Sequence, residues 1–230
     1  FFYQILKLNN TKVASIGTLG VKADGINFDL PNTTIDPIQL GRILNNLKKK
    51  GVDNVIMEAS SHGLEQSRLD GLLFSIGIFT NFSQDHLDYH KNLNTYLKAK
   101  LYLFKNLIKK KGHIITDEKI PEFIKIKKIS ANQSLKLHKI NSKGSFKILS
   151  HYYQDETQII KIQLKNSIKT IKLNLIGKIQ LNNILMAIIA AKKSNLSFDR
   201  IFEIIPKIKS VDGRFEKIGK IKNNSKVILD

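Results

Sequence analysis

One short segment of this chain gathers side chains that could bind a metal ion. Residues 80–90 read TNFSQDHLDYH and contain two aspartates and two histidines, at Asp85, His86, Asp88 and His90. The apolar run that precedes them, residues 74–79, is typical of a buried strand. The acidic and imidazole groups are therefore expected at the carboxyl end of a strand, where open α/β sheets bind their ligands.

Lys100 is a second residue that needs a chemical explanation. It falls inside an apolar stripe at helical spacing, formed by Leu93, Tyr96, Leu97, Leu101, Phe104, Leu107 and Ile108. One interpretation is a snorkelling lysine, whose stem packs against the core while its ammonium reaches water. The other is a lysine turned inward, toward the Asp/His cluster, as part of a metal site. The stripe by itself leaves both interpretations open.

The elements that would position these residues alternate between strands and helices. Strands are predicted at Thr11–Ile16, Asn54–Glu58, Leu72–Asn81 and His113–Thr116, and helices at Ile38–Lys50 and about Leu93–Lys109. This rhythm predicts an α/β fold with a mostly parallel sheet flanked by helices. From about residue 120 to 175, short alternating segments such as Ile159–Leu164 and Thr170–Leu175 predict a small antiparallel sheet. Two helices, Leu181–Ser194 and Phe198–Ile205, follow.

The composition limits the classes of function. The formal net charge is +19, yet lysine is spread along the whole chain and arginine occurs only at Arg42, Arg68, Arg200 and Arg214. This usage indicates a general drift in composition rather than a basic patch, so we expect no nucleic-acid partner. Without cysteine there is neither a disulfide nor a thiol nucleophile. No segment has the length and apolarity of a membrane span, and we expect a soluble, cytoplasmic monomer.

Several motifs together resemble the central domain of the Mur ligases, in the branch that adds the third residue of the peptidoglycan stem peptide. The matching segments are Asn32-Thr33-Thr34, residues 58–68 (EASSHGLEQSR), residues 80–90 and Lys100. The resemblance continues to Asp212-Gly213-Arg214 and Asp230. It implies a P-loop-type domain that uses ATP to phosphorylate the carboxylate of a UDP-MurNAc-dipeptide. The amine of an incoming amino acid then attacks the acyl phosphate to form an amide.

The resemblance also implies a magnesium site. Glu58 and His86 would be ligands, and Lys100, carbamylated by carbon dioxide, would supply carboxylate-like oxygens to a second magnesium ion. Oxygen ligands suit this hard cation, and histidine is the less usual member of the set. A carbamylated Lys100 would explain the lysine in the apolar stripe. His86, Lys100 and Arg214 are therefore the expected catalytic residues.

Five residues match family positions that hold the UDP-MurNAc-dipeptide, namely Thr33, Thr34, Ser60, Gln66 and Arg68. Arginine offers a planar fork suited to carboxylate or phosphate, which a lysine cannot replace. His62 lies in the same motif, and we interpret it as a structural or supporting residue.

The resemblance also implies an ATP-binding site. Residues 177–183 read GKIQLNN, and the family has a glycine followed by two asparagines near the adenine at this place. Asn183 matches the second asparagine, and Gln180 stands in place of the first. Arg214 would reach the phosphates, and Asp230 would hold the ribose.

Both ends of the chain read as interrupted elements, a late helical segment at 1–10 and a strand at 226–230. We therefore expect an internal fragment. Residues 1–212 would form the ATP-binding domain without its P-loop, with the small β-rich part at about 120–175, and residues 213–230 would lead to a C-terminal domain. Such a fragment is expected to be inactive alone, because the Gly-rich loop that cradles phosphates is not in it.

Two alternatives stay open. One is a related ligase of the folylpolyglutamate or cyanophycin type, against which Asn32-Thr33-Thr34 and the Gln66/Arg68 pair argue. The other is a basic binding module without catalysis, which would show salt-sensitive affinity for nucleic acid. The sequence does not say whether the added amino acid is diaminopimelate or lysine.

Overall fold

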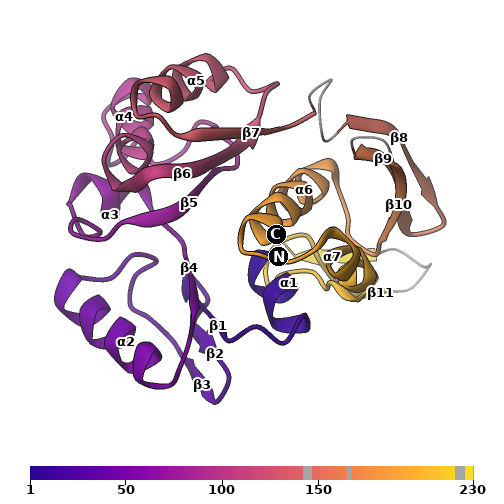
Figure 1. Cartoon of the computed structure of the whole chain (residues 1–230), viewed down its shortest axis with the longest axis horizontal. Helices are drawn as coiled ribbons and strands as arrows, with labels where there is room; N and C mark the ends of the chain where they lie inside the picture. Colours follow the sequence, from indigo (N-terminus) through magenta and orange to yellow (C-terminus); the bar gives the residue numbers. More distant parts are fainter. Residues whose placement is uncertain (142–146, 165–166, 221–225, 230) are drawn as a thin grey trace. The chain divides into compact units, whose positions relative to one another are not determined.

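The computed structural model describes residues 1–141, 147–164, 167–220 and 226–229, without the side chains of residues 217, 220, 226 and 227. The chain divides into two compact units, and each is described by itself (Figure 1). The N-terminal unit is Asn10–His138. The C-terminal unit combines Phe1–Asn9 with Lys139–Asp230.

The first sheet of the N-terminal unit has the strand order β3-β2-β1-β4. Its strands are β1 (Val13–Gly17), β2 (Gly20–Ala23), β3 (Ile26–Phe28) and β4 (Asn54–Met57), and helix α2 (Pro37–Lys49) packs against them. Strands β1 and β4 are parallel, as predicted, whereas β2 and β3 add an antiparallel hairpin that the sequence analysis missed. The overlooked signal is Asp24-Gly25, because Gly25 has the positive φ that tight hairpin turns require.

The second sheet of this unit has the order β5-β6-β7, with β5 (Phe74–Phe79), β6 (Ile108–Asp117) and β7 (Lys136–Ile140). Strands β5 and β6 are parallel. The helix predicted to reach Lys109 is shorter, since α4 (Leu93–Tyr102) and a π-helical turn, η1 (Leu103–Leu107), lead directly into β6. The predicted strand at His113 therefore begins five residues earlier. The prediction of strands alone after residue 120 is also wrong at α5 (Phe123–Asn132), because Ile126 and Ile129 bury one helical face.

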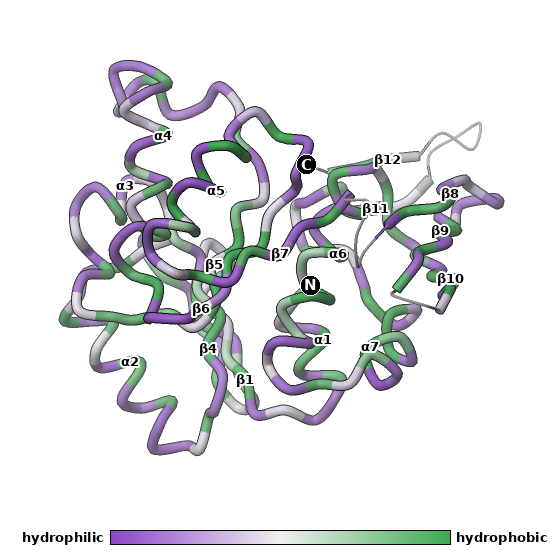
Figure 2. Tube along the Cα trace, turned by 45° about the horizontal axis from the view of Figure 1, so that its top comes forward, coloured by the Kyte–Doolittle hydropathy of each residue, from purple (hydrophilic) through white to green (hydrophobic). Residues whose placement is uncertain are grey.

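Two apolar cores hold the N-terminal unit together. One joins the β1–β4 sheet to α2 through Ala14, Ile16, Leu40 and Leu47. The other joins β5 and β6 to α4, η1 and α5, and its members include Phe79, Leu97, Leu101, Phe104, Ile114 and Ile126. Figure 2 shows hydrophobic and hydrophilic residues alternating along helices such as α2. The carboxyl ends of β4 and β5, which carry the predicted site, are therefore anchored in packed sheets.

The C-terminal unit contains the predicted antiparallel sheet, in the order β10-β9-β8, from β8 (Lys147–Gln154), β9 (Thr157–Leu164) and β10 (Ser167–Leu173). The largely buried helix α6 (Lys178–Lys193) contacts α1 (Phe2–Leu8) and α7 (Phe198–Ile204). The turn η2 (Ile205–Lys207) and the hairpin of β11 (Glu216–Lys220) and β12 (Lys226–Leu229) complete the unit. The structure confirms the predicted helical segment within residues 1–10, the two helices predicted at Leu181–Ser194 and Phe198–Ile205, and the strand from Lys226.

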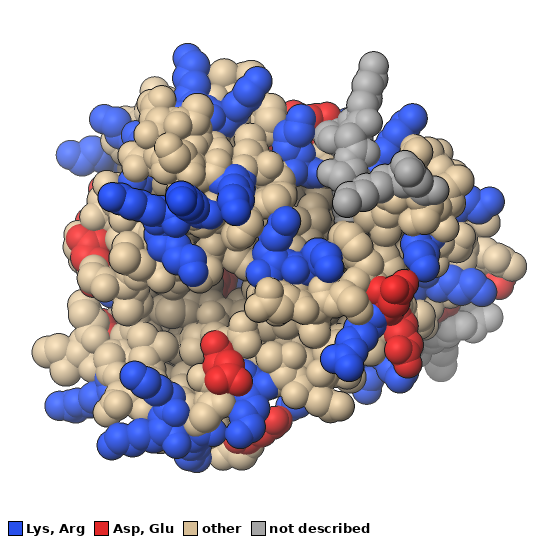
Figure 3. Space-filling model, viewed as in Figure 1, with Lys and Arg blue, Asp and Glu red and all other residues tan. Residues whose placement is uncertain are grey.

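Among the described residues, no helix combines the length and apolarity needed to span a bilayer. On the face drawn in Figure 3, lysine and arginine side chains are dispersed over many parts of the surface.

Candidate functional site

The paired ends of β1 and β4 place Glu58 beside Thr18. Because the two strands are parallel, the residues that follow Gly17 and Met57 emerge at the same edge of the sheet. The backbone N–H and the hydroxyl of Thr18 both donate to Oε2 of Glu58, each at 2.9 Å. A Cβ at Gly17 would lie only 2.7 Å from that oxygen. Glycine at position 17 therefore lets the carboxylate lie directly on the strand end.

Thr34 connects this edge to the segment that follows Glu58. Its buried hydroxyl donates to the carbonyl oxygen of Glu58 at 3.1 Å and accepts from the N–H and the hydroxyl of Ser60 at 2.9 and 3.0 Å. Ser60 in turn caps helix α3 (Ser61–Glu65), because its Oγ accepts from the N–H of Gly63 at 3.1 Å. These three hydrogen bonds use the donor and both acceptor positions of the Thr34 hydroxyl. The neighbouring Thr33 is more exposed than Thr34, and its hydroxyl lies 3.0 Å from that of Thr18.

Arg68 reaches the same segment from the far end of α3. Its guanidinium donates to the carbonyl oxygen of Thr34 at 2.6 Å. Arg68 also lines a surface pocket of about 170 Å³, whose other lining residues are Pro31, Asn32, Ile35, Asp36, Pro37 and Gln39. The structure thus brings together Arg68, Thr34 and Ser60 of the predicted substrate residues, and puts a cavity beside Asn32.

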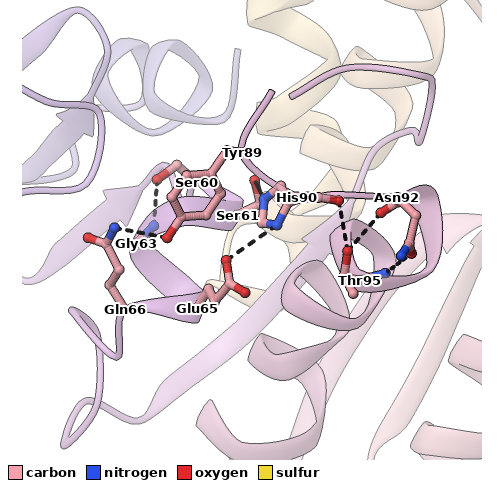
Figure 4. A network of polar contacts seen from close by, with 9 residues as sticks. All are labelled: Ser60, Ser61, Gly63, Glu65, Gln66, Tyr89, His90, Asn92 and Thr95. Carbon is pink, nitrogen blue, oxygen red and sulfur yellow. Dashed lines mark hydrogen bonds and ion pairs between the residues drawn. The ribbon is translucent and has the colours of Figure 1, made fainter. Parts of the chain in front are cut away.

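The segment after β5 folds over α3. Gln66 donates to the hydroxyl of Tyr89 at 3.0 Å, and Nε2 of the buried His90 lies 2.8 Å from the hydroxyl of Ser61 (Figure 4). Burial lowers the pKa of His90, although the Glu65 carboxylate, 3.3 Å from Nδ1, opposes that effect. The ring of His62 lies against those of Tyr89, His86 and His90.

His86 and Lys100 meet at the ring of Tyr96, a buried residue of α4. The imidazole of His86 contacts that ring edge-on at 5.7 Å, and Nζ of Lys100 lies 5.2 Å from its centre. Burial lowers the pKa of Lys100, while the charges of Asp85 and Glu58 act in the opposite direction. Lys100 is half-buried, and two carboxylates lie close enough to act on its charge.

The two carboxylates that act on Lys100, those of Asp85 and Glu58, offer the oxygen donors that magnesium prefers. No group of three His, Cys, Asp or Glu side chains that could share a metal ion occurs in the described part of the chain. Magnesium does not need such a cage, because it is usually held by one or two carboxylates together with water and substrate phosphates. Both hydrogen bonds from Thr18 reach Oε2 of Glu58, and Oε1 accepts neither of them.

The predicted ATP residues belong to the C-terminal unit. The amide of the buried Gln180 donates to the carbonyl oxygen of Arg214 at 3.1 Å, so these two residues lie together. Gly177, with φ of 87°, precedes α6, and its N–H donates to the hydroxyl of Tyr153 at 3.3 Å. Asn183 is half-buried on the first turns of α6. Asp230 lies outside the described residues.

Sequence reasoning missed several residues that shape the site. Thr18 and Gly17 were overlooked because their contact with Glu58 arises from strand pairing, which no local pattern reveals. A Cβ at Gly63 would come within 2.5 Å of the Thr34 side chain, so this glycine permits a close approach that only the fold shows. Tyr96 was taken simply as part of the apolar stripe, although its i, i+4 spacing from Lys100 was available as a signal.

The architecture and this site define the class of protein. The Mur ligase middle domain family matches residues 1–191, and the chain belongs to that family. The Rickettsia montanensis protein named UDP-N-acetylmuramoyl-L-alanyl-D-glutamate--2,6-diaminopimelate ligase is 34% identical over 234 residues, covering 100% of this chain and 48% of the relative. A relative with the same name from Chelativorans sp. is 33% identical over 231 residues, with 100% and 48% covered.

Solved structures agree with this family. A UDP-N-acetylmuramoyl-L-alanyl-D-glutamate--2,6-diaminopimelate ligase superposes with a TM-score of 0.83 at 25% identity, over 96% of this chain and 45% of the other. The apo form of L. casei FPGS superposes with a TM-score of 0.71 at 14% identity, over 100% and 63%, which shows a shared fold. The chain spans about half the length of the curated relatives that it matches.

Proposed function

We propose that the protein containing this chain joins diaminopimelate to UDP-N-acetylmuramoyl-L-alanyl-D-glutamate in an ATP-driven reaction of peptidoglycan synthesis. The observation that carries the proposal is the match of diaminopimelate ligases to the whole chain at about one-third identity. The relatives are named for diaminopimelate rather than lysine, and this supports diaminopimelate as the proposed amino acid. The cytoplasm, which holds ATP, is the proposed location, and we propose that the protein acts as a monomer.

The network around Thr34 supports a substrate-binding role for the β4–α3 segment. Ser60 and Gln66 cap the two ends of α3, and Arg68 follows it. Because Thr34 bonds to both Ser60 and Arg68, the spacing of these residues is set before substrate arrives. In the proposed complex, Thr33, Ser60 and Gln66 bind sugar and peptide groups through hydroxyl and amide contacts. Arg68 has guanidinium donors beyond the one used on Thr34, and these suit a carboxylate or phosphate of the dipeptide nucleotide.

A magnesium ion at Glu58, His86 and Lys100 would neutralise charge on the transferring phosphoryl group. Glu58 is held for this role by Thr18, and His86 by its contacts with Asp85 and Tyr96. In the C-terminal unit, Gln180, Asn183 and Arg214 would hold the nucleotide, with Asp230 at the ribose. These residues bind and orient, which is the main contribution of a protein to phosphoryl transfer.

The environment of Lys100 supports carbamylation. Since burial lowers its pKa, a larger fraction of its amine is neutral at a given pH than in an exposed lysine. The lone pair of the neutral Nζ would attack the carbon of carbon dioxide. An N–C bond would form while the π pair of one C=O bond moves to its oxygen, and one proton would leave Nζ for water. The product carries a negative charge where Lys100 had a positive one.

The test is a ligation assay with the full-length protein, UDP-MurNAc-L-Ala-D-Glu, ATP and magnesium, followed by mass spectrometry. With diaminopimelate the product should gain the mass of one diaminopimelate residue, whereas lysine at the same concentration should give far less product. Parallel reactions contain a reduced folate with glutamate, the substrates of the folylpolyglutamate alternative. Ligation in those reactions alone would overturn the proposal. Salt-sensitive nucleic-acid binding without any ligation would favour the basic binding module.

A further inference from the structure

His90 lies in a buried arrangement that the ligase reaction does not explain. Its side chain joins the hydroxyl of Ser61, at 2.8 Å from Nε2, to the carboxylate of Glu65, at 3.3 Å from Nδ1 (Figure 4). The order serine, histidine, carboxylate is that of a hydrolase triad. However, Ser61 is only 4% exposed and His90 only 2%, so no substrate carbonyl could reach the hydroxyl. The arrangement therefore holds structure in place rather than attacking a substrate.

The structure held in place is the junction between α3 and the segment 85–91. The Gln66–Tyr89 hydrogen bond lies next to the Glu65–His90 contact. Two consecutive residues at the end of α3 are therefore held by two consecutive residues of the segment 85–91. The backbone of His90 is fixed as well, because the hydroxyl of Thr95 donates to its carbonyl oxygen at 2.8 Å. Thr95 is the residue whose N–H is capped by Asn92 at the start of α4. His90 thus connects α3 to α4.

Tyr96 carries this connection toward the predicted metal ligands. Its ring stacks on His90 at 5.0 Å and 22° between planes, and meets His86 edge-on at 5.7 Å. Lys100, one turn further along α4, has its Nζ 5.2 Å from the centre of the same ring. Tyr96 is 4% exposed, so its ring has little freedom to move away from these three neighbours.

We propose that His90 and Tyr96 are positioning residues that couple the substrate-binding element to the metal side of the site. His90 fixes α3, whose two ends are capped by Ser60 and Gln66. Tyr96 fixes His86 and Lys100. This inference deepens the proposed function and rests on it, because the groups that are positioned are the proposed magnesium and substrate residues. Neither positioning residue touches the substrate.

Separate variants remove the contacts of Tyr96 with the predicted metal ligands and the contacts of His90 with α3. Tyr96→Leu removes the ring from between His86 and Lys100, and Tyr96→Phe restores the ring without the hydroxyl. His90→Phe keeps a ring on Tyr96 but loses the contacts with Ser61 and Glu65. Phe104→Leu is the matched control, since Phe104 is 2% exposed and its ring contact is with Phe79, in the apolar core below the site. Tyr96→Met, whose unbranched, flexible side chain adapts better to the space left by the ring, replaces Tyr96→Leu if that protein does not fold.

Two quantities are measured on the full-length protein, together with a melting curve. They are the dissociation constant for magnesium, by calorimetry without substrates, and the kinetic constants of ligation. Tyr96→Leu should weaken magnesium binding about 10- to 100-fold, the usual effect of losing a residue that orients metal ligands, while Tyr96→Phe recovers it. His90→Phe should raise KM for UDP-MurNAc-L-Ala-D-Glu more than it changes magnesium affinity. Phe104→Leu should lower the melting temperature and change neither constant.

If Tyr96→Leu and His90→Phe behave like Phe104→Leu, losing stability alone, the positioning inference is wrong. A failure of the unsubstituted protein to ligate would instead overturn the proposed function. In that case magnesium calorimetry still decides the inference, because equal affinities in Tyr96→Leu and the unsubstituted protein would contradict it.

Discussion

Lys100 is a charged residue in an apolar stripe, and this unexpected position marked it as a candidate site residue. The apolar stripe of α4 made the lysine conspicuous, and the structure finds it half-buried and within the influence of Asp85 and Glu58. The sequence could not choose between a snorkelling and an inward lysine, because the choice depends on residues that are 15 and 42 positions away in the chain. The tertiary fold, rather than a local pattern, brings those carboxylates near Lys100.

The first prediction at the residue scale concerns this lysine. Lys100→Ala in the full-length protein should nearly abolish ligation, and added acetate should restore part of the activity by supplying oxygen ligands. The assay is ligation rate against magnesium concentration with and without acetate, and a melting curve checks folding. Near-normal activity of the alanine variant would return Lys100 to the snorkelling interpretation.

The lowered pKa of Lys100 gives a second prediction. Between this lowered pKa and the usual value near 10.5, the unfolded chain binds more protons than the folded one, so the free energy of unfolding rises with pH in that window. Below the window the buried charge is destabilising. In buffers free of carbon dioxide, Lys100→Met should therefore be more stable than the unsubstituted protein at pH 7, and its advantage should shrink as pH rises. A methionine variant that is less stable at pH 7 would show that Asp85 and Glu58 outweigh the burial cost.

Arg68 provides the third prediction. Its fork donates to Thr34 and lines the pocket beside Asn32, so Arg68→Lys should raise KM for the UDP-MurNAc-dipeptide far more than KM for ATP. Loss of a hydrogen bond to a charged group typically costs about 1.5–3 kcal/mol. Arg42→Lys, on the exposed face of α2, is the control and should change neither constant. Equal changes in both KM values would remove Arg68 from the substrate pocket.

At the scale of elements, local patterns predicted those that bury an obvious face. The strands β1, β4 and β5 and the helices α2 and α6 were found because their apolar residues follow the expected periods. The β2–β3 hairpin was missed because its strands are only four and three residues long. Residues 123–132 read as alternating, since lysines separate the isoleucines, and burial against β6 selects the helix instead.

The contact between α3 and Thr34 yields a prediction for this scale. Gly63→Ala should destabilise the fold by about 1–3 kcal/mol, as overpacking of a buried contact does, because its Cβ would press on Thr34. Gly41→Ala in α2 is the matched control, since its Cβ meets nothing within 4 Å, and it should stabilise the protein by up to about 1 kcal/mol. Denaturant unfolding of both variants measures the difference. A Gly63→Ala protein as stable as Gly41→Ala would show that Thr34 can move aside.

At the scale of the whole molecule, the chain combines a formal net charge of +19 with a candidate site in which carboxylates, imidazoles and one lysine are the predicted functional groups. The sequence predicted the class of fold and many of the candidate residues, while the division into Asn10–His138 and the remaining residues came from the structure. The motifs could be read from the sequence because each is contiguous. The contacts among Thr18, Thr34, Glu58 and Arg68 could not, because they connect segments that are distant in the chain.

The most direct test of the proposed ligase reaction traces the carboxylate oxygen atoms of UDP-MurNAc-L-Ala-D-Glu. The full-length protein is given ATP, magnesium, diaminopimelate and UDP-MurNAc-L-Ala-D-Glu labelled with ¹⁸O in its carboxylates. In the proposed reaction, a carboxylate oxygen bonds to the γ-phosphorus as ADP leaves, and the amine of diaminopimelate then displaces phosphate. Mass spectrometry should find one ¹⁸O in each phosphate released and an equal amount of the diaminopimelate-containing product. Unlabelled phosphate, or phosphate release without that product, would contradict the proposed ligase reaction.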